Sequence, residues 1–346
     1  MKLKYFVLIF IISVLSFSFT GFFNLSFIFA PKIPAYASHW TPPIGIPMPT
    51  FGIDEQAPAT PNPWTSSVAS FYYVDQSNAS ACSDTANGNG WPGRPRCTIP
   101  LTLGPGSVVE LHGTYSSRTP GQTGLDHSSP YGLHLNGTVT APVFIRGISQ
   151  TQRPTVYNDW EVDGSYFIVE NIKFAKINQN DAADFQDKID LLFGDHMVLR
   201  HSEISGNLYG GGLYASGNGS VVWNNNIHDN GDWQNTLSIP DQDVHGIGVG
   251  GTIGSGGPLT GLWVIDNIIS RSSGDGIQIN GTNAGTRYIY VARNTAYQNK
   301  QVGFGTKYAS DVIFSQNTSY SHRPSSSSGG ECMVQQHGPE RVWFIF

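Results

Sequence analysis

The sequence predicts an all-β solenoid in which short strands from successive repeats stack on one another. The first observation is composition: only 13% of the 346 residues are charged, and glycine occurs 40 times. This composition is typical of many short strands joined by tight turns rather than of a helical bundle. The second observation is internal repetition, and the third is a period-2 alternation of apolar and polar residues within each repeat.

Six apolar segments recur in the second half of the chain, and five of them close on asparagine. They are Tyr166–Asn171, His196–His201, Val221–Asn226, Leu262–Asn267, Ile289–Asn294 and Val312–Asn317. Their last residues lie 23 to 41 positions apart, about one turn of a parallel β-helix, and the longest interval indicates an insertion at 231–260. Stacked asparagines predict a hydrogen-bonded ladder that is structural rather than functional.

Strand geometry predicts which side chains of these segments face the core. The third position is apolar in every segment and is expected to point inward: Ile168, Val198, Trp223, Val264, Val291 and Phe314. The fifth position is polar in every segment, so we expect it to begin a turn at the surface.

A second strand in each repeat opens on a glycine, at Gly212, Gly246, Gly276 and Gly303. The residue after each glycine is expected to point inward. The outward positions are mostly small or polar: Tyr214, Gly248, Gln278 and Gly305, then Ser216, Gly250, Asn280 and Lys307. Such a face suits an extended polymer. Earlier strands are predicted at Ser107–His112, Leu133–Leu135 and Val143–Arg146.

These G-[IF]-x-[IVT] and x-N-[IT] repeats resemble those of the right-handed parallel β-helix proteins of the pectin-lyase-like superfamily. The resemblance runs from Ser107 to the end of the chain. It implies a right-handed parallel β-helix and an exported protein that acts on, or binds, an acidic polysaccharide. The net charge of −6 and pI near 5.9 argue against a nucleic-acid partner. The motifs specify the fold much better than the activity.

The N-terminal segment predicts export. Residues 1–37 are expected to be a signal peptide, because two lysines precede a long apolar run that ends at an Ala-Tyr-Ala cleavage site. The run is long, so an uncleaved membrane anchor is the alternative. The expected location is secreted or extracellular, with the periplasm and the cell surface as alternatives.

Three further regions follow this segment. Residues 38–66 are predicted to be a Pro-rich, extended and poorly ordered linker. Residues 67–160 are predicted to be an N-terminal capping region with the early coils, and 161–346 the coils of the β-helix. The chain stops on apolar residues within a strand at 340–346. We therefore predict either a C-terminal truncation or a partner that covers this end.

Export also permits a disulfide bond. Cys82 and Cys97 are the candidates, since they lie in one loop rich in glycine, proline and asparagine. Cys332 is then left as a free thiol.

The densest polar constellation combines Asp241, Asp243 and His245 with Asp275 and Lys307. His245 and Asp275 each precede an aligned glycine, so they are expected in adjacent coils at the same turn. Cleavage of a uronic-acid polymer by β-elimination requires a group that neutralises the sugar carboxylate and a base that removes the α-proton. The resemblance therefore implies the three aspartates as Ca²⁺ ligands and Lys307 or His245 as the catalytic base.

Gln278, Asn280 and Trp233 are candidate substrate-binding residues, with Trp233 able to stack on a sugar ring. Each site residue also has a plain structural explanation: Asp275 in a Ser-Gly-Asp-Gly turn, Lys307 on an exposed strand, and Trp233 packed under its own loop. A second polar set, His201, Glu203 and His228, ranks lower because its members fall in turns.

The predicted function is that of a polysaccharide lyase that cleaves an acidic polymer, with Ca²⁺ as the implied cofactor. A uronate epimerase using His245 and Asp275 is one alternative, and a non-catalytic surface glycan-binding or adhesive β-helix is another. An adhesive face would be rich in aromatic residues, whereas this one is rich in Gly, Gln and Asn. A polygalacturonase-type hydrolase is disfavoured, because its paired-carboxylate motifs are absent from the sequence.

Overall fold

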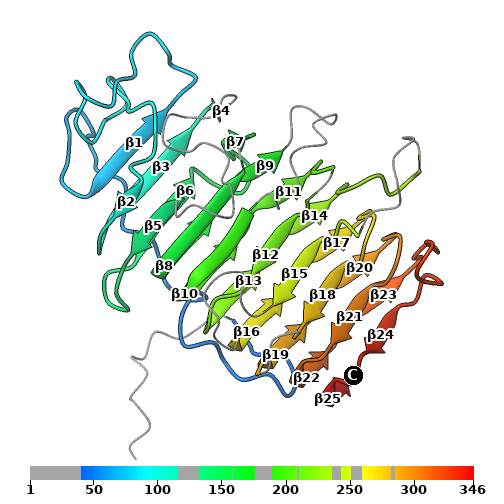
Figure 1. Ribbon diagram of the computed structural model, residues 1–346. Coiled ribbons are helices and arrows are strands. Elements are labelled where there is room, and N and C mark those ends of the chain that lie inside the picture. Colours follow the sequence, from blue (N-terminus) through cyan, green and yellow to red (C-terminus); the bar gives the residue numbers. More distant parts are fainter. Residues whose placement is uncertain are drawn as a thin grey trace, which may run out of the picture. The chain divides into compact units, whose positions relative to one another are not determined.

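The computed structural model describes residues 40–115, 132–157, 159–175, 189–208, 210–235, 243–250, 259–281 and 285–346. The predicted right-handed parallel β-helix is confirmed, because every pairing between successive strands is parallel and each coil stacks on the one before it (Figure 1). The predicted signal peptide and Asp241 lie outside the described residues. Within the described part of the chain, no helix is long and apolar enough to cross a membrane.

The coils present three faces. Face A comprises β1 (Phe71–Asp75), β3 (Val108–His112), β6 (Val143–Gly147), the second halves of β8 (Trp160–Glu170) and β10 (Ile189–Arg200), β13 (Ser220–Trp223), β16 (Thr260–Ile265), β19 (Arg287–Ala292), β22 (Ser310–Ser315) and β25 (Glu340–Ile345). Face B comprises β2 (Thr102–Leu103), β5 (Leu133–Asn136), the first halves of β8 and β10, β12 (Leu213–Ala215), β15 (Ile247–Gly250), β18 (Ile277–Asn280), β21 (Phe304–Lys307) and β24 (Met333–Gln336). Face C comprises β4 (Thr114–Tyr115), β7 (Thr155–Val156), β9 (Lys173–Ala175), β11 (Glu203–Ser205), β14 (Asn226–His228), β17 (Ile268–Ser270), β20 (Thr295–Tyr297) and β23 (Thr318–Tyr320).

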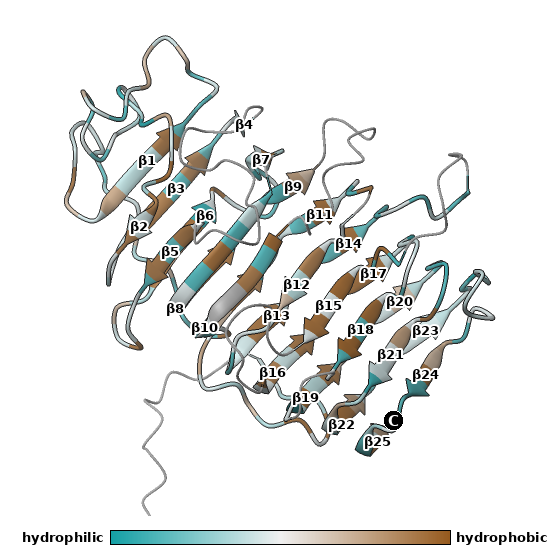
Figure 2. Cartoon of the chain, viewed as in Figure 1, coloured by the Kyte–Doolittle hydropathy of each residue, from teal (hydrophilic) through white to brown (hydrophobic). Residues whose placement is uncertain are grey.

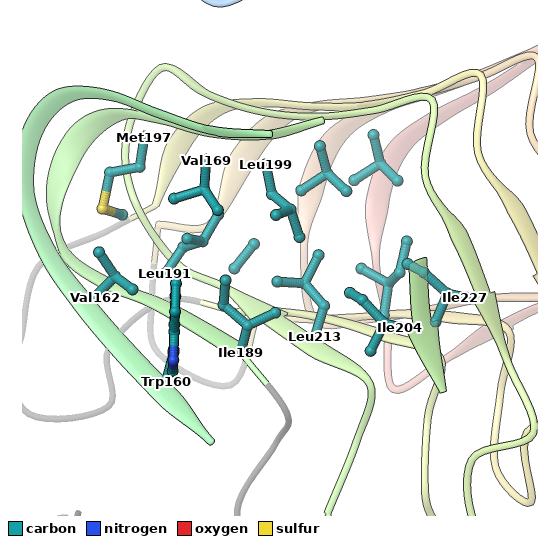
Figure 3. Close-up of a cluster of buried hydrophobic side chains, with 14 of the residues drawn as sticks. Trp160, Val162, Val169, Ile189, Leu191, Met197, Leu199, Ile204, Leu213 and Ile227 are labelled. Atoms are coloured by element: carbon teal, nitrogen blue, oxygen red, sulfur yellow. The ribbon is translucent and has the colours of Figure 1, made fainter. Parts of the chain in front are cut away.

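The core lies between the three faces. Figure 3 shows Leu199 of face A, Leu213 of face B and Ile204 of face C pointing toward one another, and all three are fully buried. The apolar segments of β8 and β10 that supply such residues are coloured brown in Figure 2. Because each coil buries its apolar residues only against its neighbours, the array forms one continuous core.

The inward assignment of the third position is correct in half of the segments. Val264, Val291 and Phe314 belong to the core cluster. In contrast, Ile168 and Val198 point outward and Trp223 packs on the outer side of face A, with Val222 taking the inward place. A shift of one residue moves a side chain to the opposite face of a strand. The pattern misleads here because face A is apolar on both sides, as expected for a sheet that is covered on both sides.

The outer side of face A is covered by residues 40–60, which we call the strap. Ile46, Phe51 and Ile53 of the strap are buried against apolar residues of β8, β10, β13 and β16. Polar contacts follow the same path: the indole Nε1 of Trp263 donates to the Pro47 carbonyl at 2.9 Å. In Figure 1 the strap (blue) passes beside the strands of face A. The expectation of a poorly ordered linker is therefore wrong for these residues, which are part of the fold.

The asparagine ladder runs along the axis at the turn from face A to face C. The side-chain oxygens of Asn267, Asn294 and Asn317 each accept the backbone N–H of the ladder residue in the preceding coil, at 2.9 Å in each case. The ladder is thus confirmed for these residues. In two earlier coils its members are Asn225 and Ser202, one residue away from the predicted Asn226 and His201.

Replacing Asn267 with alanine is expected to lower the free energy of unfolding by about 3 kcal/mol. The side chain accepts from Asn225 and donates to the Val222 carbonyl, and each buried partner left unpaired costs roughly 1–3 kcal/mol. Denaturant unfolding measures the loss. Asn317→Ala is the control, because Asn317 is partly exposed and water can replace its bonds. Equal losses for the two variants would contradict the dependence of this loss on burial.

The loop that precedes β2 contains a disulfide bond between Cys82 and Cys97, with a Cα–Cα distance of 5.0 Å. The loop also uses the carboxylate of Asp84, which accepts the backbone N–H groups of Cys97 and Thr98. Cys332 is free and exposed.

Candidate functional site

Four strands of face B, β12, β15, β18 and β21, hold the predicted site residues in register. Gln278 lies opposite Gly248 in one direction and Gly305 in the other. Asn280 lies between Gly250 and Lys307 in the same way. The predicted outward columns are therefore correct. The inward residues of these strands, from Leu213 to Phe304, are fully buried, as predicted.

Asp275 lies at the centre of the polar cluster, immediately before β18. It is only 2% exposed. Its Oδ2 accepts a hydrogen bond from Gln278 Nε2 at 3.1 Å, and its backbone N–H donates to His245 Nδ1 at 3.0 Å. The carboxylate lies over Gly305, where a Cβ atom would come within 2.7 Å of Oδ2. Glycine at position 305 therefore makes room for this carboxylate.

Burial raises the pKa of the Asp275 carboxyl. His245, the hydrogen bond from Gln278 and the positive charge of Lys307 act in the opposite direction, while Asp243 adds to the increase. These influences also show that the structure brings His245, Lys307 and Asp243 close to Asp275. A carboxyl that shares a surface with two basic groups, and whose neutral form is favoured, is the kind of group found at reactive sites.

The raised pKa of Asp275 predicts a pH-dependent gain in stability for Asp275→Asn. A carboxyl with a raised folded-state pKa stabilises the fold only when protonated, so its contribution is full below about pH 4 and is lost as pH rises. Asparagine stays neutral and can still accept from Gln278. We expect the variant to melt at a higher temperature than the wild type near pH 7, and at the same temperature near pH 3. A lower melting temperature at neutral pH would contradict this.

His245 is oriented as a proton donor rather than as a base. Its Nδ1 accepts the N–H of Asp275, so the neutral ring carries its proton on Nε2. Close packing holds this orientation, because a Cβ at Gly274 would lie 2.6 Å from Nδ1. Of the two predicted bases, the geometry therefore favours Lys307.

The predicted calcium ligands do not form a complete site among the described residues. Asp243 is exposed, and its Oδ1 accepts a hydrogen bond from Gln301 Nε2. Within the described ranges no group of three or more His, Cys, Asp or Glu side chains could hold a metal ion. Asp275 alone is a buried carboxylate next to basic groups, which is a poor environment for a cation. No step of the chemistry is therefore assigned to a metal.

Tyr214 is a site residue that the sequence analysis noted only as outward-facing. Its ring lies across β15: a Cβ at Gly248 would be 2.9 Å from its Cδ2, and one at Gly250 would be 2.5 Å from its hydroxyl oxygen. Both outward positions of β15 beneath this ring are glycine, because any larger side chain there would displace the tyrosine. This pair of glycines is the feature of the sequence that indicates a ring lying over β15.

Trp233 lies at the beginning of the turn from β14 to β15, whereas His245 lies at its end. The guanidinium of Arg271 is 5.9 Å from the Trp233 ring centroid, and that of Arg323 is 5.3 Å away. The indole thus packs with two cations at the end of face C. This contact agrees with the structural explanation for Trp233 more closely than with sugar stacking.

The lower-ranked polar set is part of an ion-pair network on face C. Glu203 bonds to Lys173 Nζ at 2.7 Å and lies 3.6 Å from His228 Nε2, and its pKa falls to about 2, mainly through the hydrogen bond from His228. His201 lies apart from this network, against Trp223. Burial lowers the pKa of His201 to about 4. Glu203, Lys173 and His228 already have ion-pair partners within the network, which agrees with a structural role.

No protein-family model matches the chain, and no curated protein matches it. Among solved structures it is similar to a pectate lyase, with 12% identity, 82% of this chain and 79% of that chain covered, and a TM-score of 0.46. It is also similar to a periplasmic alginate epimerase (11% identity, 79% and 67% covered, TM-score 0.47). A third is the A-module of a mannuronan C-5 epimerase from Azotobacter vinelandii (14% identity, 69% and 68% covered, TM-score 0.42). At these identities and TM-scores the similarity carries no conclusion about activity, and the parallel β-helix rests on the strand pairing of the chain itself.

Proposed function

We propose that the protein is carbohydrate-active, and that the outward side of β12, β15, β18 and β21 binds an acidic polysaccharide and cleaves it by β-elimination. The observation that carries this proposal is the buried Asp275, which hydrogen-bonds to His245 and Gln278 and lies within electrostatic reach of Lys307 on a polar face. The solved structures that the chain is similar to include a pectate lyase and an alginate epimerase, but the proposal rests on the residues of this face.

The shape of the face suits an extended chain. Gly248, Gly250 and Gly305 add no side chains to this face, whose outward side chains are those of Tyr214, Gln278, Asn280 and Lys307. Successive strands are spaced by roughly 4.8 Å, so a polymer lying across them meets a new pair of outward positions at each coil. The amides of Gln278 and Asn280 can hydrogen-bond to sugar hydroxyls in the middle of this path.

The chemistry follows from the positions of the three titratable groups. Lys307, in its neutral form, removes the proton α to the uronate carboxylate. The electrons of that C–H bond form the C=C bond as the C–O bond to the leaving sugar breaks. The Nε2–H of His245 then protonates the leaving oxygen. The backbone N–H of Asp275 holds His245 in the orientation that this proton transfer requires.

The test is ultraviolet absorbance of the mature protein with a panel of uronic-acid polysaccharides. An unsaturated product supports β-elimination. A change of sugar configuration without that product would show that the protein is an epimerase rather than a lyase. Retarded migration of the protein in a gel containing the polymer, with neither reaction, would show that it only binds the polymer.

The calcium requirement stays a prediction that the same assay can test. Loss of product with EDTA and recovery with Ca²⁺ would support the role proposed for Asp241, Asp243 and Asp275. Unchanged product in EDTA would remove it, in agreement with the incomplete ligand set of the described residues. Export is likewise proposed, because the polymers concerned lie outside the cell. Recovery from the culture medium of a protein that begins at Ser38 would support cleavage after residue 37.

A further inference from the structure

A pocket of about 340 Å³ lies on face A, between the strap and the strands β3, β6 and β8. Strap residues 56–60 form one wall, and Glu110, His112, Arg146, Glu170 and Asn171 line the rest. It is separate from the site on face B, and nothing in the proposed elimination uses it. We propose that this pocket binds a neutral sugar residue.

The charged groups of the pocket are already matched with one another. Glu110 Oε1 accepts from His112 Nε2 at 2.9 Å, and Oε2 accepts from Thr60 Oγ1 at 2.7 Å and from Arg146 Nη2 at 3.2 Å. Arg146 also donates to the Pro58 carbonyl at 3.0 Å, which ties the strap to this wall. A ligand with a net charge would therefore meet no uncompensated partner here.

The second carboxylate is matched in the same way. Glu170 is 7% exposed, and its Oε2 accepts from Arg200 Nε at 2.7 Å. Both carboxylates keep lone pairs beyond those used, since an ionised carboxylate offers about four acceptor sites. The free hydrogen-bonding atoms of the pocket are thus mostly carboxylate acceptors, and the neighbouring guanidinium groups hold these carboxylates in place. Such a lining favours an uncharged ligand with several hydroxyl donors.

The side chain of Asn171 independently indicates that a hydrogen-bond donor is missing from this pocket. Its Oδ1 is buried and has no hydrogen-bond partner in the protein. A buried acceptor left unpaired is costly, so native structures rarely keep one without a ligand or water to serve it. Asn171 lies next to Glu170 in the pocket lining, and the proposal assigns a hydroxyl of the bound sugar as its missing donor.

The remaining lining suits the apolar side of a sugar ring. Ile148 is 52% exposed at the pocket, and Ala57 of the strap also lines it. The His112 ring is fixed by stacking on Tyr73, with centroids 4.1 Å apart. The volume lies at the small end of ligand pockets, which are roughly 300–1,000 Å³. It accommodates one or two sugar units rather than a long stretch of polymer.

The test is calorimetric titration of the mature wild-type protein with D-glucose, D-galactose and D-mannose and with short oligomers of each. Asn171→Gly removes the unpaired oxygen while keeping the left-handed backbone of this position (φ 59°). Binding of one of these sugars, weakened about tenfold or more in this variant, is expected. Gln316→Gly is the matched control, because Gln316 has φ 53°, is exposed and lies outside the pocket lining.

Ile148→Glu provides a second variant that does not threaten folding, because the side chain is already exposed; it should also abolish binding. Tighter binding of an oligomer than of its monomer would indicate a polymer unit as the natural ligand, and equal binding a free sugar. Absence of binding by the wild type, or binding that survives both variants, would overturn the proposal. Lys307→Ala should leave neutral-sugar binding intact, which separates this site from the one on face B.

Discussion

Arg200→Ala is expected to lower the free energy of unfolding by about 3–5 kcal/mol, because it leaves a buried charge without its partner. The Arg200 side chain is 3% exposed and donates from Nε to Glu170 at 2.7 Å. It also donates to the carbonyls of Gly52 and Glu55 of the strap, at 3.0 and 2.7 Å. One side chain therefore joins β10, the neighbouring β8 and the strap. Denaturant unfolding with an unchanged m-value measures the effect.

The matched control for Arg200 is Arg293→Ala at the other end of the strap. Arg293 bonds to the Thr41 carbonyl at 2.9 Å and to Asp266 at 2.7 Å, but its side chain is 31% exposed. Exposed ion pairs contribute about 1 kcal/mol or less. Similar losses for the two variants would show that the strap, and not the buried Arg200–Glu170 pair, accounts for the effect.

Lys307→Ala is expected to reduce the rate of β-elimination by about 10²–10⁴-fold, the usual contribution of a general base. The thermal stability should stay close to that of the wild type, because Lys307 is half-buried on the outward side of β21. Gln336→Ala is the control, since Gln336 lies directly opposite Lys307 in the next coil and is not assigned a role. The readouts are the initial rate on the polymer identified by the panel and the melting temperature.

Lys307→Arg distinguishes a base from a neutralising cation. Arginine keeps the positive charge but does not release a proton in proteins. If Lys307 is the base, kcat should fall in this variant while KM changes little. Retention of kcat would instead show that the residue only neutralises the substrate carboxylate, and Tyr214 on the same face would then be the next candidate for the base.

The register of face B and the approach of His245 to Asp275 followed from the sequence. Each glycine-opened strand has apolar and polar positions in clear alternation, because one side faces the core and the other faces water. The tautomer of His245 could not be predicted, since it depends on one hydrogen bond to a backbone group 30 residues away. The sequence predicted that Tyr214 faces outward but not that its ring lies over β15, because that position depends on glycines in the next coil.

By itself, then, the sequence determined the repeat, the coil length and the outward columns that contain Gln278, Asn280 and Lys307, because these depend on local periodicity. Only the tertiary structure decided which side of each face A strand points to the core. It also decided that the Pro-rich segment packs on the outer side of face A. Its strands are apolar on both sides, so alternation cannot show whether Val198 or Leu199 faces the core. The strap resolves this by covering the outer side, and residues 40–60 pack there because distant coils together present a surface that no single segment contains.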